Sequence, residues 1–236
     1  MAPSDGTRMV RVTRGEIESG AVTTRLVLPT TLQPAWPPYR RVSEGIASAR
    51  RQLPSHAHER EEVLTYLIEG RASYQLEGGP VESLSAGSAL LLTAPARSRH
   101  SISPAEGASV RWFNLVLDLS GAFDAPARLQ ATDSTPGRRL VDEVEVRPLT
   151  GPRGPMTAGS GLESEVLAFL TESTTFRKVG PGRRAIVYAW AGEGSVDEHA
   201  VRAGETALIE GVPGVAVRGM EGFQAVFTSV PKEPAG

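Results

Sequence analysis

The 236-residue sequence contains no cysteine and only four histidines, and its charged residues are nearly balanced. The lack of cysteine excludes disulfides, thiolate catalysis and cysteine-based zinc sites, and it fits a reducing compartment. Lysine and arginine together number 25 against 27 aspartates and glutamates, which gives a formal net charge of −2. This balance argues against nucleic acid or an anionic membrane as the main partner.

Long hydrophobic runs are also missing. No run approaches the length of a membrane-spanning helix, and the first twenty residues lack the apolar core of a signal peptide. With 40% hydrophobic and 22% charged residues, the composition is that of an ordinary globular protein. We therefore expect a cytoplasmic protein.

Short apolar runs, rich in Val, Leu and Thr and separated by glycine and proline, dominate the chain. Many such runs predict an all-β protein, a sandwich or a barrel. Helix is scarce, although the segment 164–172 is ambiguous. The expected strands cover residues 8–13, 23–28, 62–70, 72–77, 88–93, 109–119, 139–146, 164–173, 184–192, 205–210 and 222–230.

One sequence pattern occurs twice. The segment "LTYLIEG…LSAGSALLLTA" (64–94) aligns with "IVYAWAGEG…VRAGETALIEG" (186–211). The matched pairs are Tyr66 with Tyr188, Gly70 with Gly192, and Gly87 with Gly204. Glycines at these positions suit the tight reversals between strands. A duplicated pair of small β-barrels explains the repeat, with a linker within residues 121–139 and domains over 1–125 and 126–236.

Three of the four histidines fall at two places in the first copy. Residues i and i+2 of a strand point to one face, so His56 and His58 can converge on one ion. An antiparallel neighbour can bring His100 to the same point, and three imidazoles leave coordination positions open for water or substrate. The alternative to a metal site is that these histidines are ordinary polar surface residues or hydrogen-bonded residues of a pocket.

The second copy does not repeat these ligands. Counting from the matched tyrosine and glycine of the second copy gives Lys178, Gly180 and Val217 at the positions of the three histidines. These three residues are not a plausible set of metal ligands. We therefore expect a metal site in the first barrel only. The fourth histidine, His199, is expected in an exposed hairpin loop.

These residues carry a family resemblance. "HAHEREEVLTYLIEG" with "GSALLLTAPARSRHS" resembles the pirin branch of the cupin superfamily, whose pattern runs approximately HPHRGxExVTYVLEG and then TAGxGxxHSE. The resemblance implies a bicupin, two tandem jelly-roll (double-stranded β-helix) barrels, with one mononuclear metal in the N-terminal barrel. Iron is the first expectation, and nickel, copper, manganese and zinc are the alternatives. Some pirins resemble quercetin 2,3-dioxygenases, and others act as coregulators.

One departure from the family pattern concerns the metal directly. Where the resemblance implies a glutamate ligand, two residues after His100, this sequence has Ile102. A missing carboxylate weakens divalent-metal binding. The alternative is therefore that the protein binds no metal. Glu62 shares strand parity with His56 and His58 if no bulge intervenes, so we expect a ligand, a general base or a partner of a ligand there.

Other charged residues near the histidines are weighed in the same way. Glu59 and Glu61 have the opposite parity and are expected to face solvent. Arg97 and Arg99 flank His100, and Arg97 is a candidate clamp for an anionic or phenolate substrate, with a solvated loop as the alternative.

Three functions follow. The first is an oxygenase in which His56, His58 and His100 hold the metal and a small phenolic or enolic, flavonol-like substrate binds in the N-terminal barrel. The second is a cupin with a degenerate site that catalyses a metal-independent cyclisation or isomerisation in specialised metabolism. The third is a non-catalytic regulator with a protein partner. We expect an enzyme, as a monomer or weak dimer.

Overall fold

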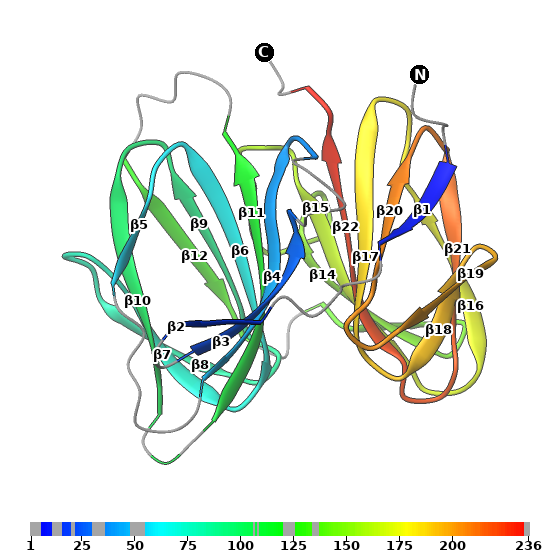
Figure 1. The fold of residues 1–236 in the computed structure, drawn as a ribbon, viewed down its shortest axis with the longest axis horizontal. Helices are drawn as coiled ribbons and strands as arrows, with labels where there is room; N and C mark the ends of the chain where they lie inside the picture. The colour runs from blue at the N-terminus through cyan, green and yellow to red at the C-terminus, as the bar shows by residue number, and fades with distance from the viewer. Residues whose placement is uncertain are drawn as a thin grey trace. The chain divides into compact units, whose positions relative to one another are not determined.

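The computed structural model describes residues 6–10, 16–19, 22–29, 36–47, 55–105, 107, 109–119, 126–133 and 137–233. These residues form strands, turns and bends, without an α-helix among them (Figure 1). The all-β prediction is confirmed, and the ambiguous segment 164–172 lies mostly in strand β15 (Glu163–Phe169). It follows that the described part of the chain holds no apolar helix of membrane-spanning length.

The chain divides into two compact units. The first, here called the first barrel, comprises the described residues between Thr13 and Thr135 together with Ala158–Ser160. Its larger sheet has the order β12 (Arg128–Thr132), β9 (Ala89–Ala94), β6 (Glu61–Glu69), β11 (Val110–Asp118), β4 (Tyr39–Ala47), β3 (Val22–Leu28) and β2 (Glu16–Ser19). Its smaller sheet has the order β5 (His56–His58), β10 (Ser98–Pro104), β7 (Arg71–Leu76) and β8 (Val81–Ser85).

The second barrel comprises the described residues of 1–12, 136–157 and 161–235. Its larger sheet has the order β1 (Gly6–Val10), β20 (Thr206–Glu210), β17 (Arg183–Ala191), β22 (Gln224–Pro231), β15, β14 (Val144–Thr150) and β13 (Arg139–Val141). Its smaller sheet has the order β16 (Ser173–Lys178), β21 (Gly214–Gly219), β18 (Glu193–Val196) and β19 (His199–Arg202).

The two barrels repeat each other strand by strand. Both pair a seven-stranded sheet with a four-stranded one, and β6 and β17 hold the same place in their sheets. The turn after each of these strands has a glycine in the left-handed region, Gly70 with φ 87° and Gly192 with φ 71°. A Cβ on Gly70 would lie 2.1 Å from the carbonyl oxygen of Ser109, so no other residue fits that turn. The repeat detected in the sequence is a repeat of structure.

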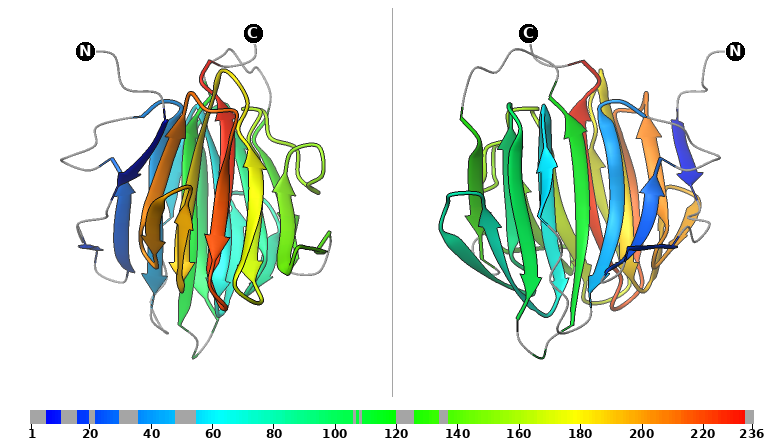
Figure 2. Two further views of the ribbon diagram at one scale, coloured as in Figure 1. Left: turned by 90° about the vertical axis from the view of Figure 1, so that its right-hand side faces the viewer. Right: turned by 60° about the vertical axis from the view of Figure 1, so that its left-hand side comes forward.

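Each barrel is completed by a strand from beyond the expected domain boundaries. β12, within the expected linker, pairs with β9 of the first barrel. β1, from the start of the chain, pairs with β20 of the second barrel at the equivalent edge (Figures 1 and 2). The division therefore differs from 1–125 and 126–236. Linker residues 121–125 and 134–136 lie outside the described part.

The inner faces of the two barrels follow strand alternation. On β6, Val63 and Leu67 belong to the buried apolar clusters of the first barrel. On β17, Ala185 and Ala189 hold the same repeat positions and belong to the core of the second barrel. Residues of odd number on β6 therefore face the interior of the first barrel, and residues of even number face the other side of the sheet.

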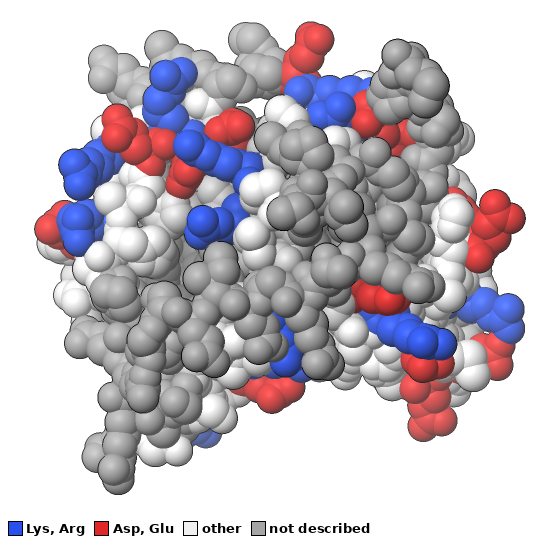
Figure 3. All heavy atoms as spheres, viewed as in Figure 1, with Lys and Arg blue, Asp and Glu red and all other residues white. Residues whose placement is uncertain are grey.

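Charged side chains of both signs are interspersed over the visible face. Figure 3 shows Lys and Arg beside Asp and Glu in the described part of that face. Exposed ion pairs also occur among the described residues, such as Arg218 with Glu172 and Arg202 with Glu193. This mixture is what the nearly neutral sequence leads one to expect.

Candidate metal centre

Three histidines from two adjacent strands meet in the smaller sheet of the first barrel. His56 and His58 lie two residues apart on β5, and His100 on β10 is the register partner of His56. The Nε2 of His100 lies 2.9 Å from Nε2 of His56 and 3.0 Å from Nε2 of His58. The convergence that the sequence predicts from strand parity is confirmed.

The group is buried on one side and open on the other. His58 and His100 are buried, whereas His56 is exposed. The exposed His56 therefore gives the group one side that faces solvent. Among the described residues this is the one group of His, Asp or Glu side chains with the closeness that a bound ion needs.

Glu61 fixes the protonation pattern of His58. The Nδ1 of His58 is hydrogen-bonded to a carboxylate oxygen of Glu61, and Arg40 contacts the other oxygen at 2.7 Å. Because a carboxylate accepts hydrogen bonds, His58 carries its proton on Nδ1 and keeps the lone pair of Nε2 free. That lone pair lies beside Nε2 of His100, within the group of three nitrogens, as a metal ligand requires.

The solvent-facing position expected for Glu61 is therefore wrong, although Glu59 is exposed as expected. The reason lies in Arg60, whose φ of 54° breaks β5 from β6. Side-chain alternation does not carry through a residue in the left-handed region, so parity counted from His58 fails beyond it. Glu61 shares its face with Val63 and Leu67 and points into the barrel.

For the same reason Glu62 lies on the opposite face of β6, away from the histidines. Its buried carboxylate accepts hydrogen bonds from Thr93 Oγ1 at 2.9 Å and from the backbone N–H of Gly159 at 2.8 Å. Ser160 donates both its backbone N–H, at 3.2 Å, and its hydroxyl. The structure does not bring Glu62 together with His56, His58 and His100, and the carboxylate holds the segment Ala158–Ser160 instead.

The imidazole of His100 is in the neutral state that a metal ligand requires. Burial first, and then the neighbouring His56 and His58, lower the pKa of His100 from 6.5 to about 2, so this ring is neutral at physiological pH. Metal–nitrogen bonds of about 2.1 Å at a right angle place two nitrogens about 3 Å apart. The observed spacings of 2.9 and 3.0 Å match this arrangement. The residues present fit a divalent ion held by three Nε2 atoms.

Ile102 occupies the place where the family resemblance implies a carboxylate. It lies two residues after His100 on β10 and points into the barrel, where it packs with Tyr74, Leu90 and Trp112. The position thus faces the interior, and it contributes to the apolar core. The ligand set offered by the described residues consists of the three histidines alone.

The two arginines beside His100 differ in their surroundings. Arg99 donates a hydrogen bond from Nη2 to the carbonyl oxygen of Ser55 at 2.9 Å, which ties β10 to the residue before β5. Arg97 is exposed on the turn between β9 and β10. Arg97 thus remains accessible to a ligand approaching from solvent.

Tyr74 is a neighbour of the histidines that the sequence analysis did not single out. Its ring centroid lies 4.9 Å from that of His100, and its buried hydroxyl has no hydrogen-bond partner among the described residues. The Nδ1 of His100 is also buried without one. Burial raises the pKa of the Tyr74 hydroxyl, so it stays protonated. The alternation in "RASYQL" was the signal that could have placed this ring inside the barrel.

The second barrel presents different residues at the equivalent positions. β16 corresponds to β5 and β21 to β10. Val217 pairs with Val196 as Ile102 pairs with Tyr74, so Val215 is the counterpart of His100, and it pairs with Arg177. Arg177 and Val179 thus stand where His56 and His58 stand, in place of the Lys178 and Gly180 obtained by counting. The count failed because the segment between β16 and β17 is longer than that between β5 and β6. His199, expected in a loop, is the first residue of β19 and half-buried.

Two barrels of this topology, with three converging histidines in one of them, define the chain as a bicupin with a candidate metal site. The sequence matches no protein-family model and no curated protein. Its fold nevertheless matches solved structures over nearly the whole chain, and bacterial pirins are among them.

Three of these structures show the extent of the match. Pirin YhhW from Escherichia coli, in complex with nickel(II), superposes with a TM-score of 0.82 at 14% identity, over 96% of this chain and 100% of that one. GK1651 from Geobacillus kaustophilus gives 0.85 at 19% identity, over 98% and 100%. A quercetin 2,3-dioxygenase from Acinetobacter baumannii gives 0.84 at 14% identity, over 96% and 79%. At these identities the likeness establishes the fold, and the predicted bicupin is confirmed.

Proposed function

We propose that this protein is a mononuclear metalloenzyme of the pirin type that oxygenates a small phenolic or enolic, flavonol-like substrate. The observation that carries the proposal is the convergence of the Nε2 atoms of His56, His58 and His100 in the first barrel. Two of the structural neighbours support the reaction type, the pirin that binds nickel(II) and the quercetin 2,3-dioxygenase.

The chain's own residues have distinct tasks in this proposal. The three histidines hold the ion, Glu61 keeps His58 in the ligating tautomer, and the apolar wall around Ile102 excludes water from one side. When bound, a divalent metal supplies Lewis-acid and redox chemistry to a substrate enolate and dioxygen. Exposed Arg97 attracts the anionic oxygen of the substrate toward the open side.

The metal is proposed to be iron, with nickel as the first alternative because the pirin neighbour holds that ion. Imidazole nitrogen accepts iron, nickel, copper, manganese and zinc, so the ligand type alone leaves the choice open. A set of three neutral histidines carries no charge of its own and thus leaves the ion fully dicationic. Such an ion favours an anionic substrate oxygen as a further ligand.

A second function is favoured by Ile102, which places a hydrocarbon side chain where the resemblance implies a carboxylate ligand. In this alternative the site of the three histidines has lost its metal and performs a cyclisation or isomerisation. The acid and base then come from His100 and Tyr74, whose Nδ1 and hydroxyl lack partners among the described residues.

Metal content distinguishes the two functions. Protein purified without a histidine tag or added metal is analysed by mass spectrometry, together with the His58→Ala variant and the control variant His199→Ala, which changes the histidine of the second barrel. We expect close to one iron or nickel per chain, lost in His58→Ala and kept in His199→Ala, and oxygen consumption with quercetin in the same pattern. Negligible metal in all three proteins would contradict the oxygenase and leave the metal-independent reaction.

A further inference from the structure

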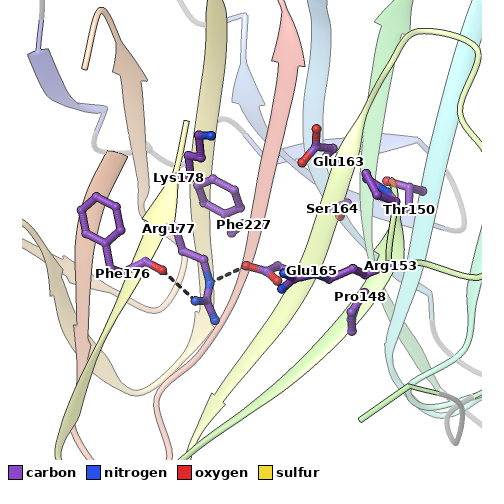
Figure 4. A pocket seen from close by; sticks show the side chains of 11 residues that line it. Pro148, Thr150, Arg153, Glu163, Ser164, Glu165, Phe176, Arg177, Lys178 and Phe227 are labelled. Atoms are coloured by element: carbon purple, nitrogen blue, oxygen red, sulfur yellow. Dashed lines mark hydrogen bonds and ion pairs between the residues drawn. The ribbon is translucent and has the colours of Figure 1, made fainter. Parts of the chain in front are cut away.

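The second barrel contains a cavity of about 440 Å³ that the metal centre does not use (Figure 4). Its volume lies in the range of small-molecule sites. Three of its lining residues, Pro148, Glu165 and Phe227, are register partners on the adjacent strands β14, β15 and β22. Because Phe227 belongs to the core cluster of the second barrel, these side chains face the interior, and the cavity opens from it.

Arg177 is placed in this cavity by the repeat of the fold. It lies on β16, at the position that His56 occupies in the first barrel, and its register partner Val215 faces the core. At matched positions of the smaller sheets, one barrel thus carries an imidazole and the other a guanidinium group. A guanidinium group recognises anions and does not bind metal ions.

The guanidinium of Arg177 is only partly satisfied. Its Nη1 donates to Thr175 Oγ1 and to the carbonyl oxygen of Phe176, both at 2.9 Å, and its Nε is ion-paired with Glu165 (Figure 4). Its Nη2 is buried and has no hydrogen-bond partner among the described residues. The side chain is 12% exposed, so water replaces the missing partner poorly.

The charge around the cavity is positive. Its lining contains the cations Arg153, Arg177 and Lys178 against the carboxylates Glu163 and Glu165. Glu163 is half exposed and lies 3.5 Å from Arg183, a cation outside the lining, which offsets part of its charge. Burial lowers the pKa of Arg177 and raises that of Glu165, which shows that both groups lack solvation. An additional anion would relieve the unpaired donor and the excess of positive charge together.

We propose that the second barrel binds a small carboxylic acid with an apolar body. The carboxylate accepts hydrogen bonds from Nη2 of Arg177, and the apolar body packs on Phe227 and Pro148. A single carboxylate matches the single excess charge of the lining. The site is separate from the three histidines, because every residue that lines it belongs to the second barrel.

The test uses phenylacetate as the probe in isothermal titration calorimetry with the full-length protein. Benzyl alcohol, which has an aromatic body and no charge, and phenethylamine, which is cationic, serve as matched ligands. We expect one phenylacetate per chain and at least about tenfold weaker binding of the other two, because the charge-assisted hydrogen bond is missing. Binding is expected to be the same in wild type and in His58→Ala, which separates this site from a carboxylate bound to metal in the first barrel.

Three further variants test the residue. Arg177→Met alone would leave a buried carboxylate unpaired and risk unfolding, so it is combined with Glu165→Gln, and the double variant is expected to bind phenylacetate at least about tenfold more weakly. Glu165→Gln alone removes the competing carboxylate and is expected to strengthen binding several-fold. Arg218→Met, which breaks an exposed ion pair with Glu172 in the same barrel, is expected to leave binding unchanged.

The proposal fails if wild-type protein does not bind phenylacetate, or if phenethylamine binds as tightly. It also fails if binding disappears in His58→Ala, since the carboxylate then occupies the metal centre. Equal binding by the folded double variant and by wild type would place the ligand away from Arg177 and overturn the assignment as well.

Discussion

The imidazole of His58 has two nitrogens, and Glu61 determines which of them faces the other histidines. The hydrogen bond to Nδ1 leaves Nε2 with its lone pair beside His100 Nε2, 3.0 Å away. Arg40 holds Glu61 from the other side at 2.7 Å. A partner of this kind orients the ring and raises its basicity, so it governs metal affinity without touching the ion.

A substitution of Glu61 therefore tests the metal centre at a residue that does not itself bind the ion. We expect Glu61→Gln to lower metal affinity by about 10- to 100-fold, because an amide orients the imidazole less strongly than a carboxylate. Competition with a chromophoric chelator measures the affinity. Glu59→Gln, two residues earlier and exposed, is the control and should bind as wild type does. Equal affinity in both variants would show that Glu61 has no part in binding.

A substitution of Ile102 can instead add a ligand to the metal centre. Ile102 follows His100 on the same face of β10 and lies in an apolar cluster. We expect Ile102→Glu to bind metal more tightly than wild type and, without metal, to lose several kcal/mol of stability, because a buried carboxylate is then unpaired. Thermal unfolding with and without metal measures both effects, and Ile102→Gln is the uncharged control. If added metal does not change the stability of Ile102→Glu, the inference that side chain 102 points toward the histidines is contradicted.

At this scale the sequence predicts what lies within one strand and fails across a turn. His56 and His58 share a face because no irregularity separates them, and His100 follows from antiparallel pairing. Glu61 and Glu62 exchange their expected faces because Arg60 has a positive φ, which no residue pattern in the sequence announces. Tyr74 was overlooked since its strand carries no chemical motif.

At the scale of elements, the segment Ala158–Ser160 belongs to the first barrel although it comes from the second half of the chain. Its attachment consists of hydrogen bonds to one buried carboxylate. The backbone N–H groups of Gly159 and Ser160 and the Ser160 hydroxyl all donate to Glu62. Strand β6 thus presents Glu61 to the metal centre from one face and Glu62 to this segment from the other.

The separation of the two faces predicts separate effects. We expect Glu62→Gln to lower the free energy of unfolding by about 1–3 kcal/mol, because an amide NH₂ meets backbone donors that had an acceptor. Metal content is expected to stay at the wild-type value. Chemical denaturation and metal analysis measure the two quantities, and the exposed Glu77→Gln serves as control. Lost metal or activity in a protein of unchanged stability would instead make Glu62 part of the centre.

Strand equivalence also decided the comparison of the two barrels. Pairing in the smaller sheets assigns Arg177 and Val179 to the positions of His56 and His58, whereas counting along the chain gave the residues one position later. Connections between strands vary in length while pairing is kept, so residue counts hold only inside uninterrupted elements. The expectation that the second copy lacks metal ligands did not depend on this detail, because neither set contains one.

At the scale of the whole molecule, each barrel is completed by a strand whose place in the sheet the local sequence does not reveal. β1 and β12 hold equivalent edges, but β1 belongs to the second barrel and β12 to the first. Periodicity identifies a strand, and its partner depends on contacts that are distant along the chain. The repeat could therefore be predicted from matched glycines and tyrosines, while the domain boundaries could not.

The contribution of β1 leads to a prediction about the two barrels as separate units. Deletion of residues 1–12 removes five ladder pairs from the edge of the larger sheet of the second barrel, from Gly6 with Glu210 to Val10 with Thr206. We expect the second barrel to lose stability on the order of a few kcal/mol, since each backbone hydrogen bond contributes about 1 kcal/mol. Metal content should remain that of the intact chain, because the histidines lie in the first barrel.

Scanning calorimetry with metal analysis measures both effects, and a shorter deletion of residues 1–5, which ends before β1, provides the control. The shorter deletion should unfold as the intact chain does, while the longer one shows an earlier transition and an unchanged metal stoichiometry. Loss of metal on removal of β1 would mean that the candidate site in the first barrel depends on the second barrel for its integrity. The two units would then have to be treated as one thermodynamic body, and binding at either site would be expected to stabilise both.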